Sequence, residues 1–155
     1  MITTILSDFS RVILNSKDKN YKGTLNGLHK ELLEEHTNYH FFDYFEFNNE
    51  VLNLYRKLKT KYSMNVFTTG TIQNRREVRQ IIDPIFEHIY TTKDFGLNKR
   101  QVESYLFVAK KLNKKSNEIL FIDDQIDNIQ AAKKAGLHTI QYSKFEELVS
   151  ELKNY

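Results

Sequence analysis

The segment Ile119–Gly136 constrains the fold of this chain more than any other stretch. It opens with four apolar residues, and an uninterrupted apolar run of that length predicts a strand of a parallel sheet that is covered on both faces. Two carboxylates, Asp123 and Asp124, follow the strand at once, and a helix that opens at Asp127 or Asn128 and ends at the closing glycine comes next. A strand, an acidic turn and a helix in this order are typical of a binding site in an open α/β sheet.

The adjacent pair Asp123 and Asp124 has two interpretations. Neighbouring carboxylates repel one another unless a cation lies between them, so the pair indicates a hard, oxygen-coordinated metal such as Mg²⁺. Alternatively, Asp127 caps the helix and the pair is a solvated turn. The segment by itself leaves both interpretations open.

Strand and helix patterns alternate along the rest of the chain. Apolar and β-branched runs predict further strands at residues 2–6, 64–68, 88–91 and 137–142. Apolar residues at helical spacing predict helices at about residues 51–61, 74–82 and 102–112. Ser143 with Glu146 predicts a capping box for a closing helix. This order predicts a doubly wound, mainly parallel α/β sheet with helices on both faces, in a single domain over residues 1–155.

The carboxyl ends of parallel strands meet at one edge of a sheet, where such folds place their sites. Here that edge would carry Asp8, Thr68, Lys99 and the Asp123–Asp124 pair. Together these residues indicate phosphoryl chemistry, with an aspartate nucleophile, a Mg²⁺ ion, and a hydroxyl and an ammonium that hold the remaining charge.

Residues 15–47 form an insert after the first strand. Polar residues 15–22 predict a loop, and Thr24 is expected to cap a helix. The aromatic cluster at residues 39–47 is too dense for a solvated loop. It is either local core beneath the neighbouring helices or a small lid or partner surface.

Composition excludes several other classes of function. The 155-residue chain has no cysteine, which rules out disulfides, thiolate metal sites and a cysteine nucleophile. No apolar run approaches the ~18 residues of a membrane span, and the first residues lack a signal-peptide pattern, so we expect a cytoplasmic protein without a membrane partner. The net charge is only +3 and the lysines are dispersed, so nucleic-acid binding is not expected.

Four motifs occur in an order that resembles a known family. They are Ile5–Ser10 (ILSDFS), Val66–Gly70 (VFTTG), Gly96 with Lys99, and Phe121–Asn128 (FIDDQIDN). In these motifs the chain resembles the haloacid dehalogenase (HAD) superfamily of hydrolases, over essentially its whole length. The resemblance implies a HAD-like, Rossmannoid fold in which the insert is a much reduced cap.

The resemblance also implies a metal site. Asp8 would be the nucleophile, forming an aspartyl-phosphate, and a ligand of Mg²⁺. Ser10, through its backbone carbonyl, would be a further ligand, together with Asp124 and with help from Asp123. Asn128 would orient these ligands.

A phosphate site is implied beside the metal. Thr68, Thr69 and the backbone amides that follow would bind the phosphoryl oxygens. Lys99 would offset the charge of Asp8 and of the phosphoryl group.

Two residues depart from the pattern of the family's phosphatases. Ser10 stands where an aspartate usually protonates the leaving group and activates water, and a serine hydroxyl cannot exchange protons near neutral pH. Arg11 stands where glycine is common, so it either binds a second anionic group of a substrate or fills the substrate's space. The expected function is a Mg²⁺-dependent phosphatase weakened by Ser10. A catalytically silent binding module, or a dehalogenase or phosphonate hydrolase, stays open as an alternative.

The reduced cap also bears on the partners of the chain. We expect a phosphorylated substrate, small or macromolecular. An open site suits a large one, such as a phosphoprotein or a nucleotide end, or it requires a second subunit to exclude water. The aromatic cluster makes a homodimer one such arrangement.

Overall fold

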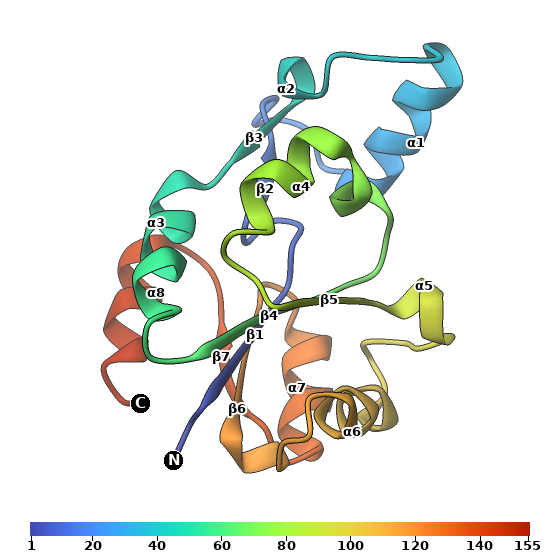
Figure 1. Ribbon diagram of the computed structural model, residues 1–155. Coiled ribbons are helices and arrows are strands. Elements are labelled where there is room, and N and C mark those ends of the chain that lie inside the picture. The colour runs from blue at the N-terminus through green and yellow to red at the C-terminus, as the bar shows by residue number, and fades with distance from the viewer.

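The computed structural model describes residues 1–155 and has a parallel sheet at its centre (Figure 1). The sheet has five strands in the order β5-β4-β1-β6-β7, and every neighbouring pair is parallel. These strands are β1 (Thr4–Ser7), β4 (Ser63–Thr68), β5 (His88–Thr91), β6 (Ile119–Asp123) and β7 (His138–Gln141). They lie close to the apolar runs of the sequence, and the predicted doubly wound α/β fold is confirmed.

Alternation along the strands divides the core into two layers. Ile5 packs in one cluster of buried side chains and Leu6 packs in another, because successive side chains of a strand point to opposite faces. The first layer is covered by α3 (Asn49–Leu58), α4 (Arg76–Ile82) and α8 (Phe145–Leu152). The second layer is covered by α6 (Val102–Lys111) and α7 (Ile126–Lys134), which lie across the sheet from α3 and α8 in Figure 1.

The register of the strands brings several chain segments to one edge of the sheet. Ser7, the last residue of β1, pairs with Val66 on one side and Ile122 on the other. The next residue, Asp8, donates its backbone amide to the carbonyl of Ile122 at 2.8 Å. The polar residues that follow β1, β4 and β6 are therefore neighbours in space.

The insert after β1 contains a second, small sheet. In it β2 (Leu14–Ser16) pairs antiparallel with β3 (Phe45–Phe47). The chain between these two strands forms α1 (Leu25–Glu35) and the short α2 (Phe41–Tyr44). The expectation that residues 15–22 form a loop is therefore wrong for the first two of them. The pairing explains the miss, because β2 is a three-residue strand whose partner lies far along the chain.

The aromatic cluster of the insert is local core. Tyr39, Phe41 and Phe45 are buried in the larger core cluster, and the rings of Phe41 and Phe45 stack with centroids 4.7 Å apart. Phe42 and Tyr44 stay exposed on the outside. The first of the two interpretations is confirmed, whereas the homodimer stays a prediction.

The N-termini of two helices can be compared with the caps that the sequence predicts. The Thr24 hydroxyl accepts a hydrogen bond from the amide of Gly27 at 3.0 Å, so the predicted cap of α1 is confirmed. The capping box of Ser143 with Glu146 is wrong, because α8 has Lys144 at its N-cap and the Ser143 hydroxyl bonds the carboxylate of Glu147 instead.

Three short elements complete the chain: η1 (Ile72–Asn74), α5 (Thr92–Phe95) and η2 (Ser116–Glu118). None of the helices combines the length and the apolar character needed to cross a bilayer.

Candidate active site

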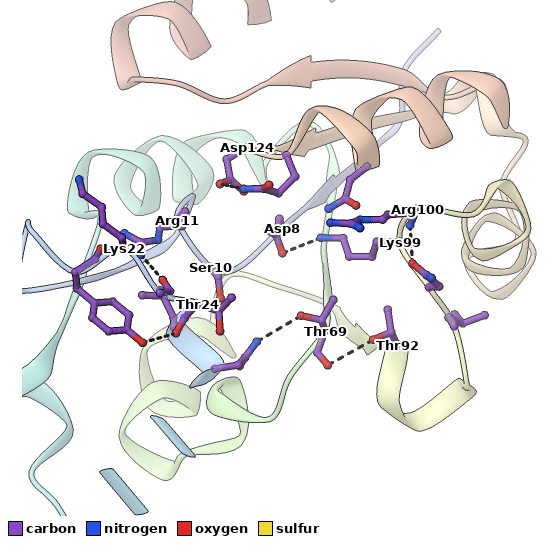
Figure 2. Close-up of a pocket in the computed structure, with 18 of the residues that line it drawn as sticks. Asp8, Ser10, Arg11, Lys22, Thr24, Thr69, Thr92, Lys99, Arg100 and Asp124 are labelled. Carbon is purple, nitrogen blue, oxygen red and sulfur yellow. Dashed lines mark hydrogen bonds and ion pairs between the residues drawn. The ribbon is translucent and has the colours of Figure 1, made fainter. Parts of the chain in front are cut away.

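A buried lysine joins the two acidic motifs at the edge of the sheet. The Nζ atom of Lys99 lies 2.9 Å from Oδ1 of Asp8 (Figure 2). It also lies 2.6 Å from Oδ2 of Asp123. Only 3 % of the lysine side chain is exposed. The hydroxyl of Tyr105, on α6, donates to the Lys99 carbonyl at 2.6 Å and fixes the backbone that carries the ammonium. Buried charges persist only where they are paired in this way.

Asp123 uses both carboxylate oxygens on protein partners. Besides Lys99, it accepts hydrogen bonds from the side-chain amide of Asn128 at 3.2 and 3.1 Å and from the backbone amide of Gln125 at 2.8 Å. The expected opening of the helix at Asp127 or Asn128 is wrong, because α7 begins at Ile126 with Gln125 at its N-cap and both residues lie inside it. Asp123 is therefore a fully engaged anchor for Lys99 and for the start of α7.

Asp124 is in a different position from its neighbour. Its carboxylate has one protein partner, the side-chain amide of Gln125 at 2.6 Å, and the residue lines a cavity together with Asp8. Carboxylate oxygens of Asp8, Asp123 and Asp124 all lie within 4.8 Å of one another. Three convergent carboxylates form a donor set suited to a hard cation, with Asp8 and Asp124 the two that face the cavity.

Burial sets the protonation of these groups. It raises the pKa of the Asp8 carboxyl to about 7. The Lys99 ammonium lowers this pKa and the Asp123 carboxylate raises it, but burial has the largest effect. Burial by itself lowers the pKa of Lys99, but the carboxylates of Asp8 and Asp123 outweigh it and the net shift is upward. The pKa of Asp124 is raised as well, chiefly by burial. A cation between these carboxylates would favour their charged forms.

Two hydroxyls beside the carboxylates have no hydrogen-bond partner. They belong to Ser10, in the loop after β1, and to Thr68, at the end of β4, and both oxygen atoms are buried. The backbone carbonyl of Ser10 likewise accepts no hydrogen bond. Buried polar atoms without partners are rare in folded proteins and call for an explanation, such as a missing ligand or ion.

The cavity has a volume of about 760 Å³ and is lined mainly by polar residues. Asp8, Ser10, Arg11, Thr69, Lys99, Asp124 and Asn128 line it, whereas Thr68 and Asp123 lie behind its wall. The structure thus brings together all the residues that the sequence singled out for the site. Of the two threonines, Thr69 is the one on the cavity surface.

Sequence reasoning missed the residues that support the site from a distance. Tyr105 holds Lys99, and Tyr55 on α3 shares a 2.9 Å hydrogen bond with the hydroxyl of Ser7, just before Asp8. Asn26 on α1 approaches the Thr69 hydroxyl at 3.4 Å. Nothing local in the sequence signals these contacts.

Comparison with known proteins agrees with the geometry. Residues 5–142 match the model of the family described as haloacid dehalogenase-like hydrolase. A glyceraldehyde 3-phosphate phosphatase of Methanocaldococcus jannaschii is 30% identical over 84 residues, which are 52% of this chain and 37% of the relative. An enolase-phosphatase E1 of a Synechococcus species is 30% identical over 83 residues, or 50% of this chain and 32% of the relative. The chain thus spans about a third of the length of these relatives.

Solved structures match over nearly the whole chain. A HAD family enzyme of Bacteroides thetaiotaomicron, crystallised with magnesium and inorganic phosphate, superposes with a TM-score of 0.68 at 17% identity and covers 96% of this chain and 99% of its own. A HAD-like hydrolase of Porphyromonas gingivalis gives a TM-score of 0.67 at 17% identity, covering 100% of this chain and 99% of its own. At this identity the likeness establishes the fold.

Proposed function

Since this chain belongs to the haloacid dehalogenase-like hydrolases, we propose that it is a Mg²⁺-dependent phosphatase that works through an aspartyl-phosphate on Asp8. The observation that carries the proposal is the buried Asp8–Lys99–Asp123 arrangement with two unpartnered hydroxyls beside it. The names of the curated relatives, both phosphatases of phosphorylated small molecules, support a substrate of that class.

Magnesium fits the donor set. Asp8 and Asp124 offer cavity-facing carboxylates and Ser10 offers a free backbone carbonyl, while Asp123 and Asn128 hold the surrounding groups in place. When bound, the ion supplies positive charge that neutralises phosphoryl oxygens and favours an ionised Asp8. The magnesium complex of the Bacteroides relative supports this choice of metal.

The residues of the chain can carry out the transfer in two steps. A carboxylate oxygen of Asp8 attacks phosphorus as the bond to the leaving-group oxygen breaks, and water later attacks the same phosphorus and releases phosphate from Asp8. Lys99 holds the carboxylate oriented and balances the charge that Asp8 and the phosphoryl group bring together. The Thr69 hydroxyl on the cavity surface donates to a phosphoryl oxygen, and the unpartnered Thr68 hydroxyl behind the wall would be a second donor.

Ser10 makes the chemistry slow for ordinary phosphate esters. No other carboxylate lines the cavity besides Asp8 and Asp124, so the leaving group must take its proton from solvent. Losing a positioned general acid and base typically costs about 10²- to 10⁴-fold in rate, or roughly 3 to 5 kcal/mol of barrier. The same residue supports the second candidate, a catalytically silent module that binds a phosphorylated ligand.

A rapid-mixing assay with Mg²⁺ separates the two candidates. The substrate is 4-nitrophenyl phosphate, whose leaving group departs without a proton, and the proteins are wild type, Asp8→Asn and Ser10→Asp. We expect a burst and slow release in wild type, no burst in Asp8→Asn, and steady turnover in Ser10→Asp because the new carboxylate can activate water. The absence of a burst in every variant, with Mg²⁺ bound, would leave only the binding module. Turnover that persists in Asp8→Asn would exclude Asp8 as the nucleophile.

A further inference from the structure

One wall of the cavity is built by the insert. Residues Tyr21 to Asn26 line the cavity on the side of Asp8 away from Lys99, and Figure 2 shows Arg11 and Lys22 there, with Lys99 and Arg100 across from them. Asn26 lies close against the loop after β4, since a Cβ atom added at Gly70 would come within 1.9 Å of its amide oxygen. The insert therefore reaches the proposed phosphate site without a separate cap domain.

Arg11 links this wall by hydrogen bonds to the loop after β1 that carries Asp8. Its guanidinium donates to the carbonyl of Gly23 at 2.7 Å and to that of Tyr21 at 3.3 Å. The backbone of Arg11 has a φ of 66°, a conformation that is costly for a side chain of this kind and that persists only where surrounding contacts hold it. Strain of this sort three residues after a nucleophile is typical of a functional constraint.

The fastened segment is tightly packed on itself. The hydroxyl of Tyr21 donates to the carbonyl of Thr24 at 3.2 Å, and a Cβ atom added at Gly23 would come within 2.3 Å of that hydroxyl. Glycine is thus required at residue 23 for the tyrosine to lie where it does. This packing fixes the direction in which the intervening Lys22 leaves the backbone.

The cations of the cavity differ in whether a carboxylate neutralises them. Lys99 is paired with Asp8 and Asp123, Lys19 is paired with Glu46, and Arg100 lies 3.6 Å from Asp127.

Arg11 has only neutral carbonyls as partners, and Lys22 has no hydrogen-bond or ion-pair partner. Two positive charges therefore face the cavity uncompensated, both on the insert side.

These charges are not needed for the phosphoryl group itself. Under the proposed function, Lys99, the threonine hydroxyls and Mg²⁺ already surround the transferring group at Asp8. The volume of about 760 Å³ leaves room for the rest of a substrate between Asp8 and the insert. Uncompensated cations at that place attract an anion and disfavour a neutral or cationic group.

We propose that the cavity selects substrates with a second anionic group, a carboxylate or a second phosphate, which Lys22 and the remaining N–H donors of Arg11 bind on the insert side of Asp8. The proposal rests on the proposed function for the position of the first phosphate. Lys22 contacts the second anion directly. Arg11 is in addition a positioning residue, because its contacts to Tyr21 and Gly23 hold Lys22 toward the cavity.

The test measures binding rather than turnover. In the Asp8→Asn background with saturating Mg²⁺, calorimetry compares 3-phosphoglycerate with glycerol 3-phosphate, which differ in a carboxylate against a hydroxymethyl group. We expect 3-phosphoglycerate to bind more tightly. Lys22→Met should weaken that ligand about fivefold, the size of one partly exposed charge pair, and should leave glycerol 3-phosphate nearly unchanged. Lys133→Met, which removes an exposed lysine of α7 outside the cavity, is the matched control.

Arg11→Gly tests the positioning role. Glycine accepts the backbone conformation, so the melting temperature should hold while the preference for 3-phosphoglycerate is lost. Equal affinity for the two ligands, no binding of either, or an equal effect of Lys133→Met would overturn the proposal. The burst assay on wild type reports separately on the proposed function, so a burst combined with equal affinities would reject the second-anion site alone.

Discussion

The two sides of the cavity differ in whether their charged side chains are paired with a group of opposite charge. On the Lys99 side Asp8, Lys99 and Asp123 are buried and paired with one another, and the supporting residues come from β1, β6, α6 and α7. On the insert side Arg11 and Lys22 have no carboxylate partner, and the segment is held by hydrogen bonds to neutral carbonyls. Under the proposed function the paired side would position the reacting groups, and the insert side would select the substrate.

This contrast has an energetic counterpart. Breaking a buried ion pair leaves an uncompensated charge and is costly, but changing a half-exposed cation mainly alters what the site attracts. Mutations on the Lys99 side should therefore reduce stability, and mutations on the insert side should change ligand preference with little loss of stability. Four predictions test this contrast, in decreasing order of the change that we expect.

Lys99→Met should be the most destabilising change. It leaves the carboxylates of Asp8 and Asp123 buried without their cation, and breaking such a pair typically costs about 3 to 5 kcal/mol. Urea denaturation in the absence of metal measures the free energy of unfolding. Lys110→Met, an exposed lysine on the neighbouring α6, is the control and should change stability by less than about 0.5 kcal/mol. Equal stability of the two variants would mean that the pairing on this side adds nothing.

Asn128→Ala should have the next largest effect. It removes the amide that donates to both oxygens of Asp123 and leaves part of a buried carboxylate unsatisfied, which costs about 1 to 3 kcal/mol. Gln125→Ala is the matched control, because its side chain bonds the more accessible Asp124, and we expect it to cost less than about 0.5 kcal/mol. Thermal unfolding of both variants ranks them, and the reverse order would contradict the assignment of Asp123 as the anchor.

The stability of the metal-free protein should depend on pH through Asp8. Its pKa is about 7 in the folded protein, above the ordinary value of 3.8, so the folded state binds the proton more tightly than the unfolded state. Stability should therefore rise as pH falls from about 7 toward 4, by on the order of 1 kcal/mol per pH unit. Lys99, whose pKa is raised further above neutrality, stays charged in both states over this range and adds no slope.

Asp8→Asn is the control for the pH dependence. Unfolding curves between pH 5 and pH 8 should keep their slope in wild type and lose most of it in the variant, since asparagine takes up no proton. Equal slopes in wild type and in Asp8→Asn would contradict the raised pKa of Asp8.

The smallest effect concerns the strained backbone of Arg11. Arg11→Gly and Arg11→Ala both remove the guanidinium, but only glycine accepts a φ of 66° without strain. We expect the alanine variant to be less stable than the glycine variant by about 1 kcal/mol, measured by urea denaturation. Equal stability would show that the loop relaxes once the side chain is gone and that the insert side carries no stored strain.

The strand positions and the acidic edge of the site could be predicted from the sequence because both rest on local patterns. The apolar run before Asp123 and the one before Thr68 each predict a buried strand, and the parallel order of strands then brings their ends together. The site residues were found at those ends for the same reason. The capping box at Ser143 failed because a short motif competes with other local hydrogen bonds, here the one to Glu147.

Other features depended on contacts between distant segments. The strand β2 forms because it pairs with Phe45–Phe47, and a segment of three residues is too short for its apolar pattern to predict a strand. Thr69 rather than Thr68 lines the cavity because of the turn that follows β4. The support of Lys99 by Tyr105 joins residues whose relation becomes visible only when α6 packs on the sheet.

The family, the parallel sheet and the set of acidic, hydroxyl and ammonium groups at its edge follow from residue order and local apolar patterning. The different contacts that these groups make follow from the packing of distant segments. Asp123 and Asp124 are adjacent in the chain and chemically identical, yet Lys99 and Asn128 engage the first and leave the second facing the cavity. Likewise, Arg11 holds the insert in place because the carbonyls of Tyr21 and Gly23 accept hydrogen bonds from its guanidinium. Which partner a charge meets is settled by packing between segments, and that information is not local in the sequence.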